Sequence, residues 1–272
     1  MTSCHPAGPM VAIINATPVS VRPALAGLAA GYPEAEPWTL LDDRLVKDAE
    51  AAGGLTEPLA RRMRTLITYA VDSGASAVLL SCSMYGPVLQ QARLDHPHIP
   101  MTASDEALFA EVAERADDTV LLLGPLAPAV SDTASRLQAV LDAAGSPTAL
   151  RPHVVDGAAA ATARGDLAGL DELLIQAVET NRDDRLSAVV LANFSISPAR
   201  AAVQAATALP VLEPTTPAAR ALRRRVTEAV GDCCRWRSPA PGTARRPSGP
   251  PGVDRASPEV NRASRGTPGG AR

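Results

Sequence analysis

The segments Ser76-Ala77-Val78-Leu79-Leu80-Ser81-Cys82 and Ser187-Ala188-Val189-Val190-Leu191-Ala192-Asn193 align residue by residue at a constant offset of 111. Two further pairs of segments follow in the same order, namely 11–15 with 120–124 at an offset of 109, and 99–101 with 209–211 at an offset of 110. Three anchors with nearly one offset indicate an internal repeat, so we predict two similar units of about 110 residues.

Each repeated segment is a short apolar run that ends in small or polar residues, which is typical of strands buried on both faces of a parallel sheet. Helical patterns separate these runs at 59–73, 106–115, 131–144, 166–181 and 217–230. The alternation predicts an α/β fold with two parallel-sheet units, related by a pseudo-twofold axis, with a ligand cleft between them. The predicted divisions are a flexible N-terminus at 1–9, a first unit at 10–118, a second unit at 119–237 and a tail at 238–272.

The amino-acid composition favours a globular protein over a membrane protein or a nucleic-acid-binding protein. The 272 residues are 46% hydrophobic and 20% charged, which suits a globular chain, and the 3% of aromatic residues offers few platforms for stacking bases. No apolar run reaches the roughly 20 residues that a membrane span requires, and residues 1–9 lack the basic start of a secretion signal. We therefore expect a cytoplasmic protein without a nucleic-acid or membrane partner. The sequence does not define the oligomeric state, and a homo-oligomer is one of the alternatives.

The C-terminal segment 238–272 differs from the rest of the chain. It holds seven Pro, six Gly and six Arg in 35 residues and carries a charge of +4, which leaves −7 on residues 1–237. Such a segment buries too little apolar surface to offset its ordering entropy, so we predict disorder. Two interpretations stay open, a solvated extension and a basic arm for an acidic partner.

The ends of the predicted strands are the candidate site. Ligands of open α/β sheets bind beyond the carboxyl ends of the strands, where the sequence places Asn15, Cys82, Gly124 and Asn193. A pseudo-twofold arrangement makes Cys82 and Asn193 face each other across one cleft. Cys82 precedes a predicted helix that starts near Pro87, and the N-terminus of a helix lowers the pKa of a thiol. The four cysteines, Cys4, Cys82, Cys233 and Cys234, have neither a metal-binding spacing nor a disulfide framework.

Three other residues are weighed as site candidates. Asp42 follows a predicted second strand and leads toward Gly53-Gly54, and the alternative is a helix cap. The adjacent carboxylates of Asp42 and Asp43 would repel an anionic substrate unless Arg44 or an ammonium group on the substrate compensates, so an active-site Asp42 favours an amino acid over a dicarboxylate. Tyr85 either covers a substrate or packs in the core, and Glu213 either faces the site or is a solvated loop residue. No glycine spacing supports nucleotide binding.

The segment 74–83, with the sequence Gly-Ala-Ser-Ala-Val-Leu-Leu-Ser-Cys-Ser, resembles the first cysteine motif of the aspartate/glutamate/hydantoin racemase superfamily. Residues 13–15, 122–124 and 188–195 resemble the other strand ends of that family, and the resemblance covers roughly residues 10–230. It implies a pair of cysteines, one in each half, that exchange a proton on opposite faces of the carbon next to a carboxylate. Hydroxyl and backbone N–H groups hold the carboxylate, and neither a cofactor nor a metal is required.

This chain departs from the family pattern where Asn193 takes the place of the second cysteine. An Asn side chain donates and accepts hydrogen bonds, but it does not exchange a proton at neutral pH. The resemblance implies Cys82 and Asn193 as the catalytic pair. The substrate-binding residues that follow from the resemblance and the strand ends are Asn15, Thr17, Asp42, Ser83, Met84, Tyr85, Gly124, Phe194 and Ser195.

The resemblance implies a cofactor-independent isomerase, similar to an amino-acid racemase, that acts on a small amino acid or carboxylic acid. Three chemistries stay open for one thiol. Cys82 either serves as one base of a racemase whose second acid is Ser195 or water, or adds to a double bond as the similar maleate isomerases do, or protonates a carbanion as the similar arylmalonate decarboxylases do. A carboxylate-binding protein without activity is the alternative of a different class.

Overall fold

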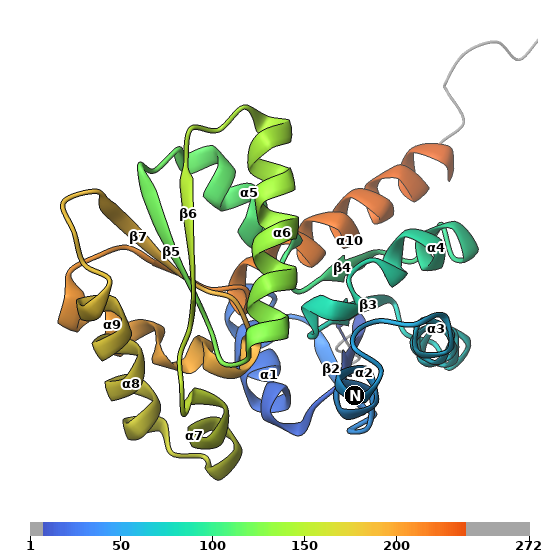
Figure 1. Cartoon of the computed structure of the whole chain (residues 1–272). Coiled ribbons are helices and arrows are strands. Elements are labelled where there is room, and N and C mark those ends of the chain that lie inside the picture. The colour runs from blue at the N-terminus through green and yellow to red at the C-terminus, as the bar shows by residue number, and fades with distance from the viewer. Residues whose placement is uncertain (1–7, 238–272) are drawn as a thin grey trace, which may run out of the picture.

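The computed structural model describes residues 8–237, which form two four-stranded parallel sheets with helices around them (Figure 1). The strand order β2-β1-β3-β4 of the first sheet recurs as β6-β5-β7-β8 in the second. The predicted α/β fold with two similar parallel-sheet units is therefore confirmed. Apart from residues 8 and 9, the predicted flexible N-terminus and the predicted disordered tail lie outside the described residues.

The strands are β1 (Met10–Asn15), β2 (Glu36–Leu41), β3 (Ala77–Leu80), β4 (Met101–Ala103), β5 (Thr119–Gly124), β6 (Ala149–Val154), β7 (Leu186–Leu191) and β8 (Val211–Leu212). The α-helices are α1 (Val21–Gly31), α2 (Leu45–Ala51), α3 (Glu57–Asp72), α4 (Val88–Asp95), α5 (Glu106–Arg115), α6 (Ala127–Ala144), α7 (Ala158–Arg164), α8 (Leu167–Thr180), α9 (Arg200–Thr207) and α10 (Thr215–Arg237). Three short 3-10 turns are η1 (Pro18–Ser20), η2 (Ser83–Tyr85) and η3 (Phe194–Ala199).

The register of the two sheets follows the repeat in the sequence. The corresponding residue pairs are Val11 with Ala77 and Val120 with Ala188 across the central strands, and Val78 with Met101 and Val189 with Val211 toward the edge. Each of these residues of the first sheet precedes its counterpart in the second sheet by 109, 110 or 111 positions, which are the offsets of the sequence repeat. The repeat therefore reflects equivalent strands in equivalent register, while the pseudo-twofold axis itself stays a prediction.

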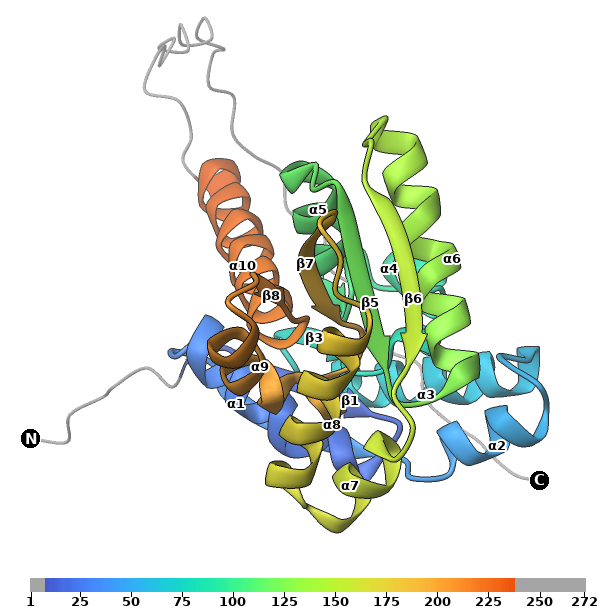
Figure 2. The ribbon, with the colours of Figure 1, turned by 60° about the vertical axis from the view of Figure 1, so that its left-hand side comes forward.

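One helix from each half packs on the sheet of the other half. Side chains of α5, among them Leu108 and Val112, share a core with Val120 of the second sheet. Side chains of α10, among them Leu222, share a core with Ile13 of the first sheet. Figure 2 shows α10 next to α1 and α5 beside β5. The predicted division between residues 118 and 119 thus separates the two sheets but not the cores around them.

Two glycines of α1 allow α10 to pack closely against α1 on the first sheet. A Cβ atom at Gly27 would lie 2.5 Å from Cβ of Thr215, and one at Gly31 would lie 2.7 Å from Cβ of Ala219. Contacts this short are excluded between real side chains, so α10 packs against α1 only because both positions lack a side chain. Gly27 and Gly31 serve helix packing, in agreement with the absence of a nucleotide motif.

The described helices include none that is long and apolar enough to cross a bilayer.

Candidate active site

Cys82 and Asn193 occupy equivalent places in the two halves. Each is the second residue after its strand, β3 or β7, and each is the N-cap residue of a 3-10 turn, η2 or η3. Both have extended backbone angles, so both side chains leave the carboxyl edge of a sheet. Parallel strands place such residues at one edge, where ligands bind in α/β proteins.

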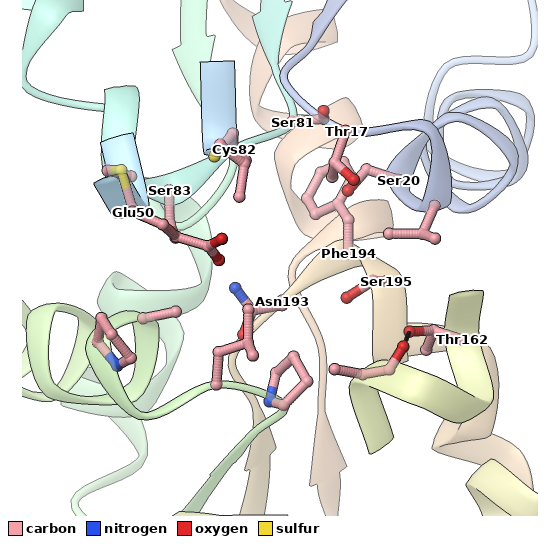
Figure 3. Close-up of a pocket in the computed structure, with 18 of the residues that line it drawn as sticks. Thr17, Ser20, Glu50, Ser81, Cys82, Ser83, Thr162, Asn193, Phe194 and Ser195 are labelled. Carbon is pink, nitrogen blue, oxygen red and sulfur yellow. Dashed lines mark hydrogen bonds between the residues drawn. The ribbon is translucent and has the colours of Figure 1, made fainter. Parts of the chain in front are cut away.

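Both side chains line one cavity of about 250 Å³ between the two units (Figure 3). The first half contributes Thr17, Val19, Ser20, Val46, Glu50, Ser81, Cys82, Ser83 and Met84. The second half contributes Pro125, Leu126, Pro128, Ala129, Asp132, Ala159, Thr162, Ala163, Asn193, Phe194 and Ser195. Most of this wall is apolar, and the hydroxyl groups gather near the thiol and near Ser195. A small cavity with a few convergent polar groups is the usual form of a ligand site.

Seven of the predicted site residues lie in this cavity and four do not. The residues that line it are Thr17, Cys82, Ser83, Met84, Asn193, Phe194 and Ser195. The residues outside it are Asn15, Asp42, Tyr85 and Gly124, and each of these has a structural role that the fold explains.

Asn15 is fully buried and joins three strands. Its Nδ2 donates hydrogen bonds to the carbonyl oxygens of Ile13 (3.2 Å) and Leu40 (3.3 Å), and its Oδ1 accepts one from Ser81 Oγ (2.7 Å). These contacts use both ends of the amide. The expected contact with substrate is thus replaced by a network that holds the ends of β1, β2 and β3 together.

Gly124 is a site of close packing. A Cβ atom there would lie 2.5 Å from Cγ2 of Val130 on α6 and 3.3 Å from Oδ1 of Asn193. The small residue lets the start of α6 and the Asn193 side chain approach the strand end. Gly124 therefore shapes the cavity from behind, while Pro125 and Leu126 form the wall itself.

Tyr85 is fully buried in the first core, and its hydroxyl donates a hydrogen bond of 2.9 Å to the carbonyl oxygen of Leu45. Burial raises the pKa of the Tyr85 phenol to about 12, so the group stays protonated and remains a donor. The packing role that the sequence left open is the one observed. Through this bond Tyr85 fixes the first residue of α2 to the turn that carries Cys82.

Asp42 lies between β2 and α2 and does not line the cavity. Its carboxylate is paired with Arg62 of α3, at 2.6 Å from Nε and 2.7 Å from the second terminal nitrogen. Asp48 of α2 pairs with the same guanidinium at 3.0 Å and with Arg44 at 2.9 Å. Asp42 thus belongs to an ion-pair network that attaches α2 to α3, and not to the cavity as the sequence suggested.

Glu213 caps α10. Its carboxylate accepts hydrogen bonds from the backbone N–H of Thr215 (2.6 Å), the hydroxyl of Thr215 (2.6 Å) and the N–H of Thr216 (3.2 Å). A carboxylate at this position is stabilised by the positive end of the helix dipole. Its role is neither of the two that the sequence suggested.

The environment of the Cys82 thiol keeps it protonated. Burial raises the pKa of the Cys82 thiol to about 11, and backbone N–H groups of Met84 and Tyr85, which hydrogen-bond the sulfur, offset only part of that rise. The sequence predicted a lowered pKa from a helix N-terminus. That expectation is wrong because the turn after Cys82 is a single 3-10 turn, η2, so desolvation exceeds the effect of its few N–H groups.

The Asn193 amide faces the cavity with its nitrogen. Figure 3 shows Nδ2 directed toward the space in front of Cys82. Oδ1 is buried and accepts no hydrogen bond from the residues that the structure describes. An amide in this orientation donates a hydrogen bond to an anionic group in the cavity but holds no exchangeable catalytic proton.

Glu50 is the most informative residue that the sequence did not indicate. It lies near the end of α2, and Figure 3 shows its carboxylate pointing into the space between Cys82 and Asn193. No motif marks it, because a Glu in a short polar helix reads as a solvated residue. Pro125 and Leu126 were detectable in principle, since they directly follow the strand end at Gly124.

Among the side chains of residues 8–229, no group of three or more His, Cys, Asp and Glu residues is arranged to hold a metal ion. Cys82 is the cysteine whose surroundings are described, and its thiol is free.

The fold and the paired strand-end residues define the class of protein. The glutamate racemase from Francisella tularensis subsp. tularensis, crystallised with D-glutamate, is similar to this chain with a TM-score of 0.62 at 12% identity, over 82% of each chain. The aspartate racemase of Picrophilus torridus has a TM-score of 0.59 at 14% identity over 81% of this chain and 95% of its own. The allantoin racemase of Klebsiella pneumoniae has a TM-score of 0.58 at 14% identity, over 81% of this chain and 89% of its own.

No family model matches the sequence. No curated protein has a significantly similar sequence. At identities of 12–14% the structural likeness establishes the fold, and the chain therefore has the fold of the aspartate, glutamate and allantoin racemases. The family resemblance seen at residues 74–83 is confirmed at this level.

Proposed function

We propose that the protein is a cofactor-independent enzyme of the isomerase type, which uses Cys82 to transfer a proton at the carbon next to a carboxylate. The substrate is a small amino acid or carboxylic acid. The observation that carries this proposal is that Cys82 and Asn193, two residues after equivalent strands, line opposite parts of one small cavity. The racemase fold of the chain supports the same chemistry.

In the proposed reaction one proton leaves the carbon on the face of Cys82, and another is added on the opposite face. Cys82 first loses its proton to solvent, which its raised pKa restricts to a small fraction of the protein at neutral pH. The thiolate then removes the proton from the carbon, and the electron pair of the C–H bond moves into the carboxylate as an enediolate. The Asn193 amide and the hydroxyls of Ser83 and Ser195 donate hydrogen bonds to the growing negative charge. A proton from water reaches the other face, either directly or through the hydroxyl of Ser195, which water then reprotonates. Cys82 is left as the thiol with which the cycle began.

A lyase is the second candidate, and the state of the thiol favours it. Because burial raises the pKa of Cys82 to about 11, the resting enzyme holds a thiol ready to donate its proton. A carbanion formed by loss of CO₂ would take up that proton on one face. The chemistry requires one thiol only, which agrees with Asn193 at the second position.

Incubation of candidate substrates in deuterated water separates these functions. Loss of optical rotation with deuterium at the carbon next to the carboxylate supports the isomerase. Deuterium incorporation with release of CO₂ supports the lyase. Binding without incorporation of deuterium contradicts both and identifies a binding protein.

A further inference from the structure

The charges in the cavity wall have one sign. Of the residues that line it, all within the described range, Glu50 and Asp132 are charged and none is Arg, Lys or His. Asp132 is already paired with Arg136, at 3.0 Å between Oδ2 and Nε. Glu50 forms no ion pair with another side chain of residues 8–229, and its carboxylate points toward the centre of the cavity (Figure 3).

A substrate carboxylate alone would be repelled by this wall. Glu50 is an exposed residue at the mouth of the cavity. Its carboxylate attracts a cationic group of a ligand that enters the cavity and repels an anionic one. An α-ammonium group is attached to the same carbon as the carboxylate, so it lies within reach of Glu50 when the carboxylate is held by the hydroxyl groups and Asn193.

The remainder of the wall is apolar and comes from both units. The side chains that form it include Val19, Val46, Met84, Leu126, Pro128 and Phe194. A second carboxylate on the substrate would lie against these residues without a basic partner. An aliphatic or aromatic substituent gains from burial there instead.

From these features we infer that the substrate is an α-amino acid with an apolar side chain, and that Glu50 binds its ammonium group. The inference rests on the proposed function for the identity of the reacting carbon. It assigns Glu50 to substrate recognition, and it excludes aspartate, glutamate and other dicarboxylates as preferred substrates.

A neighbouring cavity provides the matched control. It shares Val19, Thr162 and Ser195 with the first, and Arg22 of α1 lines its wall. If the substrate were a dicarboxylate whose distal group extends outward, Arg22 is the described basic side chain that would bind it. Replacement of Arg22 therefore tests the opposite specificity on the same protein.

The experiment uses the full chain and a panel of leucine, methionine, phenylalanine, aspartate and glutamate in both enantiomers. The 2-hydroxy analogue of leucine, which lacks the ammonium group, is included. Exchange of the α-hydrogen in deuterated water is followed by NMR. We expect kcat/KM for the apolar amino acids to exceed that for aspartate and glutamate at least tenfold. Glu50→Gln should raise KM for amino acids about tenfold, with kcat and the hydroxy analogue little changed, and Arg22→Gln should leave all values unchanged.

Three results overturn the inference. These are a preference for aspartate or glutamate that Arg22→Gln removes, equal turnover of the hydroxy analogue and leucine, and a Glu50→Gln enzyme that loses kcat at constant KM. If no substrate exchanges its hydrogen, the proposed function fails, and calorimetry decides the inference separately. Binding of apolar amino acids that Glu50→Gln weakens supports it, and absence of binding contradicts it.

Discussion

Cys82 and Asn193 are equivalent residues of a repeated structure, and their side chains line the same cavity (Figure 3). One is a thiol and the other an amide. The two halves of the site thus have the same backbone geometry and different functional groups, a thiol on one side and a hydrogen-bonding amide on the other.

Restoring a thiol on the second side should increase racemisation. Asn193→Cys places a second proton-transfer group opposite Cys82, and such groups contribute about 10²-fold or more when well positioned. We expect the rate of racemisation, measured by polarimetry, to rise about tenfold or more. Asn193→Ser, which is similar in size to cysteine, is the control for the change in volume. Unchanged stereochemistry in a folded Asn193→Cys protein would contradict the facing geometry.

The reactivity of Cys82 should depend steeply on pH. Burial raises the pKa of the thiol to about 11, and only the thiolate reacts with iodoacetamide. The rate of alkylation should therefore rise about tenfold for each pH unit between 7 and 10. Mass spectrometry of the peptide that contains Cys82 measures this rate apart from the other cysteines. A rate that levels off below pH 9 would show that the N–H groups of Met84 and Tyr85 prevail over burial.

Phe194 should be a main contributor to stability. Its ring is 1% exposed and, although it belongs to the second half, it packs among residues of β1, α1 and α10. Phe194→Ala should lower the free energy of unfolding by about 3–5 kcal/mol, because the cavity left behind adds to the lost burial. Leu94→Ala, at a side chain that is 74% exposed, should change it by less than about 0.5 kcal/mol. Denaturant unfolding followed by circular dichroism compares the two variants.

Tyr85 should act on the site through α2. Tyr85→Phe removes the donor to the Leu45 carbonyl oxygen and leaves that oxygen with its helical N–H partner only, which should cost about 1 kcal/mol of unfolding free energy. Because α2 carries Glu50, we also expect KM to rise while kcat changes little. A variant with lower stability and an unchanged KM would show that Tyr85 only packs the core.

The sequence predicts those features of the fold that depend on residues close together in the chain. Buried parallel strands require continuous apolar runs, so the repeat at Val78 and Val189 predicted two similar parallel sheets. It did not reveal β6, whose residues Arg151, Pro152 and His153 interrupt any apolar run at the edge of the second sheet. Strand ends predicted Cys82 and Asn193 because a parallel sheet fixes where its carboxyl edge lies.

Contacts between segments that lie far apart in the chain could not be predicted from the sequence. The position of Glu50 depends on how α2 is held by Tyr85 and by the ion pairs of Asp48, and no local pattern encodes that arrangement. Asn15 has a polar side chain at a strand end, yet it turns inward to join neighbouring strands. The apolar faces of α5 and α10 predicted helices that pack on a sheet, but not that each packs on the sheet of the other half.

The central claim is that the Cys82 sulfur transfers the proton at the carbon next to the carboxylate. The most direct measurement is the rate of deuterium incorporation at that carbon in deuterated water, compared between the wild type and Cys82→Ser. We expect a loss of at least about 10²-fold in Cys82→Ser, with an unchanged circular dichroism spectrum and melting temperature. Incorporation at the rate of the wild type in a folded Cys82→Ser protein would contradict this claim.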